Sequence, residues 1–230
     1  MNRWALAALA LATAPVTMVA AQDWNLTFTQ TERGHSVGNP DAQVHIIEFV
    51  SYTCPHCAHF EAESDAAMRL QYLHGGTAQV EVRSYLRNPI DIAATLVAEC
   101  GDPDDFFANH RALMLGQERW MENARNATEA QMARWQAGPI SSRMRAIGDD
   151  MGFHELMESR GLSRVEVDRC LSDEGKVQQM IADHEANNAD FEILGTPSFA
   201  INGALLDNVH SWGQLQPAIE SAATLESSGQ

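Results

Sequence analysis

The sequence of 230 residues predicts an α/β protein in which a long helical region interrupts a strand-bearing domain. An apolar run rich in β-branched residues, 44–50, precedes a helical pattern that starts at Pro55. Helix signals then fill 90–188, and a strand pattern returns near the C-terminus. Strands at both ends of a helical middle must share one sheet to bury their apolar faces. We therefore expect one domain built from 22–89 and 189–230, with an all-helical insert over 90–188.

The first 21 residues have the pattern of a secretory signal peptide. Arg3 supplies a basic start, the stretch 4–14 is apolar, and the small residues Ala20 and Ala21 suit cleavage. An uncleaved membrane anchor is the alternative, but a span needs about 20 predominantly apolar residues. Secretion would place the cysteines in an oxidising compartment.

The balance of charged residues limits the classes of partner. Asp and Glu number 31 and Lys and Arg 15, which gives a formal net charge of −16 at pH 7. Such a charge repels nucleic acids and anionic membrane surfaces, so we expect neither as a partner. Most of these acids serve solubility.

The N-terminal part predicts few strands. Polar residues and glycines dominate 22–40, so we expect a lead-in there with at most a short edge strand. The strand over 44–50 follows, and then a helix that Gly75-Gly76 should end. Over 79–86 apolar and polar residues alternate, which predicts a second strand.

Capping signals divide the helical region into pieces. Asp102-Pro103 should begin one helix, and Thr128 with Gln131 and Ser163 with Glu166 have the spacing of a capping box. We expect five to seven helices in this region from such signals. Met and Trp at helical spacing indicate core positions more often than ligand sites. The core candidates of the insert are Trp120, Trp135, Met144, Ile147 and Leu171.

The C-terminal part predicts a hairpin and a last helix. Gly195-Thr196-Pro197 precedes the apolar run 198–201. Asn202-Gly203 is a strong signal for a two-residue turn, after which 204–206 would form the returning strand. An amphipathic pattern after Ser211 predicts the final helix.

The chemistry of the sequence is concentrated in Cys54-Pro55-His56-Cys57. Two cysteines at this spacing can form a small reversible disulfide. Pro55 suits the first turn of a helix, so Cys54 falls at a helix N-terminus, where free N–H groups and the helix dipole stabilise a thiolate. His56 can add a hydrogen bond or a positive charge to the same sulfur. A stabilised thiolate favours the dithiol, so we expect the oxidised protein to donate its disulfide.

A zinc site made by the two cysteines with His56 and His59 is another use of these side chains. A turn at a helix start places them poorly for tetrahedral closure, and no second ligand cluster is evident in the sequence. We expect no metal and no other cofactor.

The order strand, Cys-x-x-Cys, helix, strand, helical insert, Gly-Thr-Pro, hairpin and helix resembles the thioredoxin-like fold of the DsbA family of periplasmic thiol:disulfide oxidoreductases. The resemblance covers nearly all of the chain after residue 21, and Cys-Pro-His-Cys is the form for which this family is known. It implies that Cys54 is the exposed nucleophile and Cys57 its buried partner. It also implies that Pro197 is a cis proline facing the pair, so that Thr196 offers a backbone edge to an extended substrate segment.

Three further features are interpreted through this resemblance. Glu48 matches a buried acid of the family, for which we expect a redox or proton-transfer role or else a purely structural ion pair. Arg83 on the next strand is its expected partner. Two departures stand out: Thr196 replaces the valine of the best-known members, and Tyr52-Thr53 replaces a pair of aromatics. Thr196 could therefore shift the redox potential or the choice of partner.

Cys100 and Cys170 both fall in the helical insert, 70 positions apart. As in some members of the family, and given an oxidising compartment, we expect a structural disulfide between them. Two buried free thiols are the alternative.

The resemblance implies a monomeric periplasmic oxidase that introduces disulfides into newly secreted proteins with free thiols. A membrane quinone oxidoreductase of the DsbB type would reoxidise it. A disulfide reductase or isomerase is one alternative, although no separate dimerisation domain is visible. A non-catalytic binding protein whose Cys-x-x-Cys is only a structural staple is the other.

Overall fold

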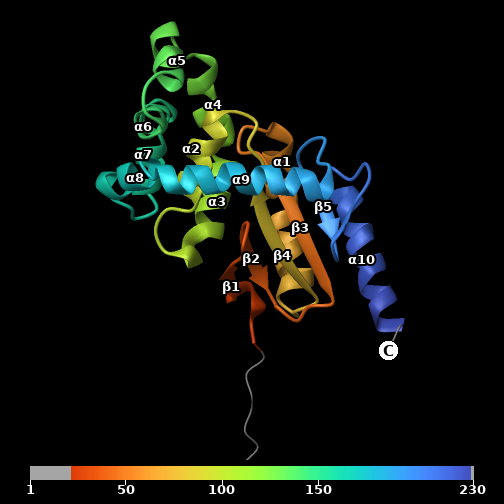
Figure 1. Ribbon diagram of the computed structural model, residues 1–230. Coiled ribbons are helices and arrows are strands. Elements are labelled where there is room, and N and C mark those ends of the chain that lie inside the picture. Colours follow the sequence, from red (N-terminus) through yellow and green to blue (C-terminus); the bar gives the residue numbers. More distant parts are fainter. Residues whose placement is uncertain (1–21, 229–230) are drawn as a thin grey trace, which may run out of the picture.

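The computed structural model describes residues 22–228 and consists of a mixed sheet with a large helical region at one end (Figure 1). The sheet has six strands in the order β1-β2-β4-β3-β5-β6. The signal peptide expected over 1–21 lies outside the described residues. The α/β fold with a helical insertion is confirmed.

Strands from both ends of the chain meet at the centre of the sheet. β3 (Val44–Val50) pairs in parallel with β4 (Ala78–Ser84) and antiparallel with β5 (Ser198–Ile201). β5 turns back into β6 (Ala204–Leu205) through Asn202-Gly203, both at positive φ as the predicted turn requires. The split domain therefore closes through β3 and β5, which are more than 140 positions apart.

The N-terminal segment forms more of the sheet than expected. After a short 3-10 turn, η1 (Trp24–Leu26), β1 (Phe28–Gln30) and β2 (His35–Gly38) make a hairpin, and β2 pairs with β4. The expectation of at most a short edge strand was wrong, because β2 lies inside the sheet and is buried throughout. Its polar His35 is covered by the insert, where its ring stacks on Phe106 at 3.9 Å.

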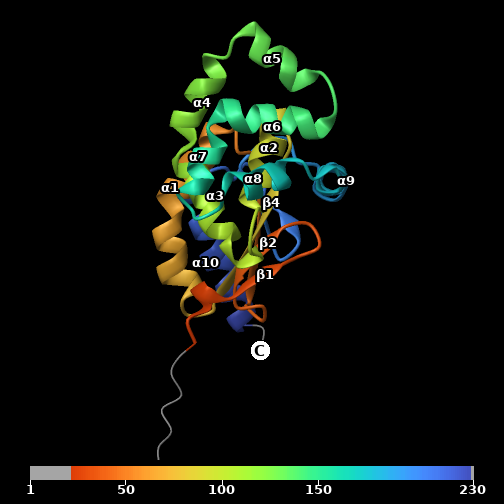
Figure 2. The same cartoon turned by 90° about the vertical axis from the view of Figure 1, so that its left-hand side faces the viewer.

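Helices cover both faces of the sheet. α1 (Pro55–Ala67), its π-helical continuation η2 (Met68–Leu73) and α10 (Trp212–Ser228) lie against one face. The C-terminal end of α9 (Glu174–Phe191) covers part of the other face, where Phe191 packs on Phe49. Figure 2 shows α9 end-on, across the sheet from α1.

The helical region runs without a strand from Pro89 to Phe191 and holds eight α-helices, more than the five to seven expected. The extra breaks fall at Gly116 and Gly152, and Gly152 has a φ of 75°, where glycine is favoured. Besides α9, the elements are α2 (Pro89–Ala98), η3 (Pro103–Asp105), α3 (Phe106–Leu115), α4 (Gln117–Arg125), α5 (Glu129–Gln136), α6 (Ile140–Met151), α7 (Phe153–Glu158) and α8 (Arg164–Leu171).

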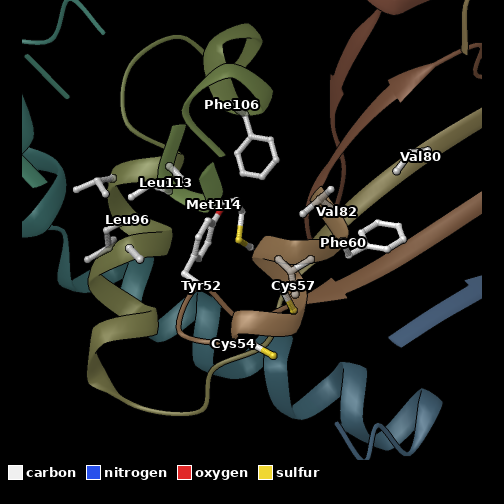
Figure 3. Packing of buried hydrophobic residues seen from close by; sticks show 14 of the residues in the cluster. Tyr52, Cys54, Cys57, Phe60, Val80, Val82, Leu96, Phe106, Leu113 and Met114 are labelled. Atoms are coloured by element: carbon white, nitrogen blue, oxygen red, sulfur yellow. The ribbon is translucent and has the colours of Figure 1, made fainter. Parts of the chain in front are cut away.

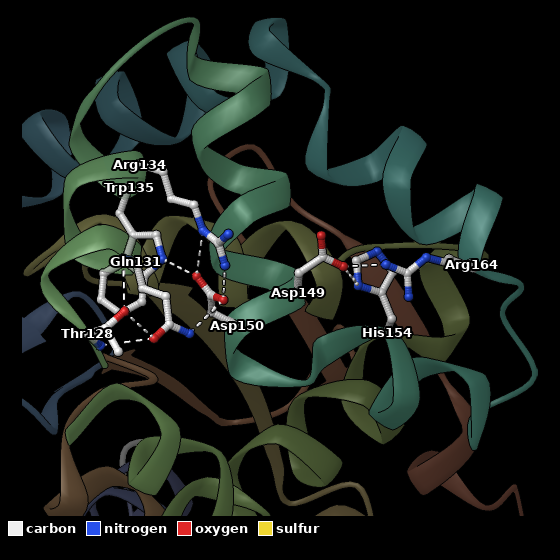
Figure 4. A network of polar contacts seen from close by, with 8 residues as sticks. All are labelled: Thr128, Gln131, Arg134, Trp135, Asp149, Asp150, His154 and Arg164. Carbon is white, nitrogen blue, oxygen red and sulfur yellow. Dashed lines mark hydrogen bonds and ion pairs between the residues drawn. The ribbon is translucent and has the colours of Figure 1, made fainter. Parts of the chain in front are cut away.

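The predicted core and caps of this region are confirmed. All five core candidates are buried, and both capping boxes form, at the starts of α5 and α8. Polar contacts then tie α6 to its neighbours (Figure 4). Asp150 accepts hydrogen bonds from Arg134 and Trp135 of α5, and the buried ring of His154 lies between Asp149 and Asp168 at 3.2 and 2.9 Å.

A disulfide joins Cys100, just after α2, to Cys170 in α8. The alternative of two free thiols does not apply to this structure. The bond closes a loop that contains most of the insert, since the two residues are 70 positions apart.

Replacing both Cys100 and Cys170 by Ala should lower the melting temperature of the oxidised protein. The loop-entropy argument gives about 4 kcal/mol for a loop of this length. Thermal unfolding followed by circular dichroism measures the effect, and in a strong reductant, which opens both disulfides, wild type and variant should melt at similar temperatures. Identical melting temperatures for oxidised wild type and variant would contradict a stabilising bond.

Candidate active site

The two free cysteines lie where β3 ends and α1 begins (Figure 3). Cys54 is the N-cap of α1 with extended backbone angles, and Pro55 occupies the first turn, as the sequence predicts. The carbonyl of Cys54 accepts hydrogen bonds from the N–H groups of Cys57 and Ala58, at 3.2 and 3.3 Å. The pair therefore sits at the positive end of the helix dipole.

Both cysteines are buried, so the expectation of an exposed Cys54 was wrong. Cys54 is 3% exposed and Cys57 is 1% exposed. The cause is a long-range contact, because the Cys54 thiol donates to the carbonyl oxygen of Thr196 at 3.2 Å. Pro55 and His56 are the exposed residues of the turn.

The pKa values of the two thiols are shifted in opposite directions. The pKa of Cys54 is lowered to about 5, chiefly by a hydrogen bond from Cys57, while burial opposes the shift. The Thr196 side chain and the backbone N–H groups of Cys57 and His56 lower it further. Burial holds the pKa of Cys57 far above its usual range. Cys54 is therefore the thiolate at neutral pH, and Cys57 stays protonated.

The loop that faces the pair carries the expected cis peptide bond, between Thr196 and Pro197. Pro197 is buried, and its carbonyl oxygen lies 2.8 Å from Nδ1 of His210, which the sequence analysis did not single out. The Thr196 hydroxyl oxygen is also buried, without a geometrically well-formed hydrogen bond.

Glu48 lies on the face of β3 that packs against α1, and it is only 6% exposed. Burial raises its pKa well above the usual range, and the charge of Glu61 adds to the shift. The expected partnership with Arg83 was wrong. The residue opposite Glu48 in β4 is Val82, so Arg83 points to the other face, where it pairs with Glu81 at 2.9 Å.

A cavity of about 390 Å³ opens beside Glu48, between the sheet, α1 and α3. Glu61 and His110 line it, with 3.6 Å between the Glu61 carboxylate and Nε2 of His110. The other ring nitrogen of His110 lies 3.0 Å from the Tyr52 hydroxyl. The sequence gave no sign of these contacts.

Two residues of the insert hold the turn before Cys54, and the sequence analysis missed both. The buried Asp91 in α2 accepts hydrogen bonds from the Ser51 hydroxyl, at 2.9 Å, and from the N–H and hydroxyl of Thr53. Gln117 in α4 donates to the carbonyl of Cys54 at 2.8 Å. The sequence around Asp91 and Gln117 carries no signal for these contacts, because their partners in the turn are 38 to 63 positions away.

Two properties of the described residues bear on other functions. Across 22–228, no three His, Cys, Asp or Glu side chains gather as a metal site. In the same part of the chain, every helix is too short or too polar to cross a lipid bilayer.

The comparison with protein families shows to which family the chain belongs. The family model described as Thioredoxin matches residues 30–221. The chain belongs to the thioredoxin family. Curated relatives of this thioredoxin-family protein include proteins of Rickettsia bellii and Rickettsia typhi whose names class them as protein-disulfide oxidoreductases. Each is 25% identical over 86% of this chain, which spans 68% and 64% of their respective lengths.

Solved structures share the fold. A protein-disulfide isomerase of Novosphingobium aromaticivorans is 40% identical, with a TM-score of 0.79 over 82% of this chain and 96% of that one. Wolbachia pipientis alpha-DsbA1 is 16% identical, with a TM-score of 0.67 over 83% of this chain and 91% of that one. The resemblance to the DsbA family is confirmed at the level of fold.

The low pKa of Cys54 can be measured directly. Ultraviolet thiolate absorbance of the reduced protein should titrate with a midpoint of about 5. Cys57→Ala should raise that midpoint, because the variant loses the largest stabilising hydrogen bond. Cys54→Ala is the control and should show no titration below about pH 8. A wild-type midpoint near 8.5, the value of a free cysteine, would contradict the account.

Glu48→Gln should make the protein more stable at neutral pH. The raised pKa of Glu48 means that the unfolded chain releases this proton at lower pH than the folded protein. The wild type should therefore lose stability relative to the variant as the pH rises above about 4.5. Urea unfolding of both proteins at several pH values tests this, and a constant difference would count against a neutral buried Glu48.

Proposed function

We propose that this protein is a periplasmic thiol oxidase that donates its Cys54–Cys57 disulfide to newly secreted proteins. The observation that carries the proposal is the contrast between the two sulfurs. The pKa of Cys54 is lowered to about 5, whereas burial keeps the pKa of Cys57 far above normal. A stable thiolate on Cys54 favours the reduced protein, so the oxidised protein readily gives its disulfide away.

The proposed reaction proceeds through a mixed disulfide. A substrate thiolate attacks the Cys54 sulfur, the bond to Cys57 breaks, and Cys57 leaves with the electron pair and takes up a proton. Glu48 lies on the face of β3 that packs against α1, and burial raises its pKa, so its protonated form can supply that proton. A second substrate thiolate then attacks the substrate sulfur and releases the Cys54 thiolate, a good leaving group because of its low pKa. Two electrons pass from the substrate to the protein.

The place of action is proposed from the chain itself. Residues 1–21 have the pattern of a secretory signal, and the Cys100–Cys170 disulfide is typical of an oxidising compartment. The names of the Rickettsia relatives support disulfide exchange as the chemistry. The substrates would be folding secreted proteins with free thiols, and a membrane quinone oxidoreductase of the DsbB type would restore the disulfide.

Isomerase activity is the second candidate, because the Novosphingobium protein that is 40% identical is described as a protein-disulfide isomerase. An isomerase starts from the reduced protein, so its Cys54 thiolate attacks a substrate disulfide and a later exchange returns the thiolate unchanged. The substrate separates the two functions, because an oxidase forms disulfides in a reduced substrate, whereas an isomerase rearranges disulfides that are already present.

A redox titration against glutathione tests the proposal. We expect the dithiol form to predominate even when oxidised glutathione is abundant, and the oxidised protein to form disulfides in a reduced, unfolded substrate. A strongly reducing potential would favour a reductase, and a Cys54–Cys57 bond that resists exchange would indicate a structural staple. Cys57→Ser should trap the mixed disulfide at Cys54, whereas Cys54→Ser should trap none.

A further inference from the structure

Gln117 connects the helical insert to the backbone of the redox turn. It is the first residue of α4 and is 6% exposed. Its side-chain nitrogen donates two hydrogen bonds, to the carbonyl of Tyr52 at 2.6 Å and to the carbonyl of Cys54 at 2.8 Å. One side chain of the insert thus holds the Tyr52–Thr53 and Cys54–Pro55 peptide groups of the redox turn.

The Cys54 carbonyl accepts hydrogen bonds both from its own helix and from the insert. The peptide group between Cys54 and Pro55 has an acceptor oxygen but no N–H, because proline lacks it. The two helical N–H groups that reach this oxygen do so at 3.2 and 3.3 Å, so the Gln117 bond at 2.8 Å is the shortest. A donor on this oxygen reduces the negative potential that the carbonyl would otherwise place beside its own sulfur.

We propose that Gln117 is a positioning residue for the redox pair, which holds the carbonyls of Tyr52 and Cys54 so that the Cys54 sulfur keeps its place at the helix N-terminus. Gln117 acts through the backbone, since both of its hydrogen bonds end on carbonyl oxygens. The inference rests on the proposed function only in taking Cys54 as the reactive sulfur. The insert would then have a second role besides covering the sheet, which is to lower the pKa of the Cys54 thiol.

The opposite side of the same turn supports this role. Asp91, in α2, accepts three hydrogen bonds from Ser51 and Thr53 and a fourth from the N–H of Arg87. Residues 51–54 are therefore held between two helices of the insert, with a carboxylate on the N–H side and an amide on the carbonyl side. Removal of Gln117 alone leaves the Asp91 contacts in place, so the turn should remain folded while its carbonyls lose a donor.

A matched control exists in the same region. Asn109 in α3 is also a buried amide whose nitrogen bridges two carbonyls, those of Ala98 and Cys100, at 3.3 and 3.2 Å. These carbonyls belong to the insert and not to the redox turn. Loss of either amide should lower stability, but only the loss of Gln117 should alter the chemistry of Cys54.

The experiment compares Gln117→Met with Asn109→Leu. Both variants should melt at lower temperature than the wild type. Only Gln117→Met should raise the Cys54 titration midpoint, by a shift equivalent to roughly threefold to tenfold in the thiol–thiolate equilibrium, the size expected for one hydrogen bond. The glutathione equilibrium should move toward the disulfide in the same variant. An unchanged midpoint in folded Gln117→Met, or an equal shift in Asn109→Leu, would overturn the proposal.

A measurement on the unaltered protein covers the case in which Gln117→Met does not fold. The side-chain amide signals of Gln117 in the NMR spectrum should move with the same midpoint as the Cys54 thiolate, whereas those of Asn109 should not. Gln117 signals that stay fixed through that titration would contradict the inference. A wild-type midpoint near that of a free cysteine would instead defeat the proposed oxidase function, and the comparison between the two variants would still decide the role of Gln117.

Discussion

The stabilisation of a negative charge on the Cys54 sulfur is the interaction on which the chemistry of this protein depends. Burial alone would raise the pKa of this thiol, since a charge is less stable away from water. Hydrogen bonds from Cys57 and from the first N–H groups of α1 outweigh that effect and bring the pKa to about 5. Cys57 receives no comparable help, and burial keeps it neutral. The local surroundings thus make Cys54 the thiolate and keep Cys57 protonated, although the two side chains are chemically identical.

Three separate parts of the chain build these surroundings. The junction of β3 and α1 supplies the cysteines and the helix N-terminus. The loop before β5 brings Thr196 against the sulfur, and the insert holds the turn through Asp91 and Gln117. Because β3 pairs with both β4 and β5, the shared sheet fixes the first two parts relative to each other. The insert is therefore part of the active-site architecture.

Local patterns in the sequence were sufficient for the elements that depend on neighbours in the chain. The redox turn, both capping boxes and the Asn202-Gly203 hairpin follow from short signals, and all appear as expected. The errors concern contacts between distant segments. Burial of Cys54 depends on a residue 142 positions away, and β2 is internal because it pairs with the distant strand β4 as well as with β1. The Glu48–Arg83 pair was the one avoidable error, since alternation along β4 already places Arg83 on the face opposite Val82.

The most direct test of the central claim compares the thermal stability of the reduced and oxidised forms in the Cys100→Ala/Cys170→Ala background, where only the redox pair changes state. The lowered pKa of Cys54 stabilises the reduced form above the pKa of the unfolded chain, and this contribution is lost as the pH falls through about 5. The reduced form should therefore melt at higher temperature than the oxidised form at about pH 8, and its advantage should shrink toward pH 5. An oxidised form that is the more stable of the two over this whole range would contradict the account.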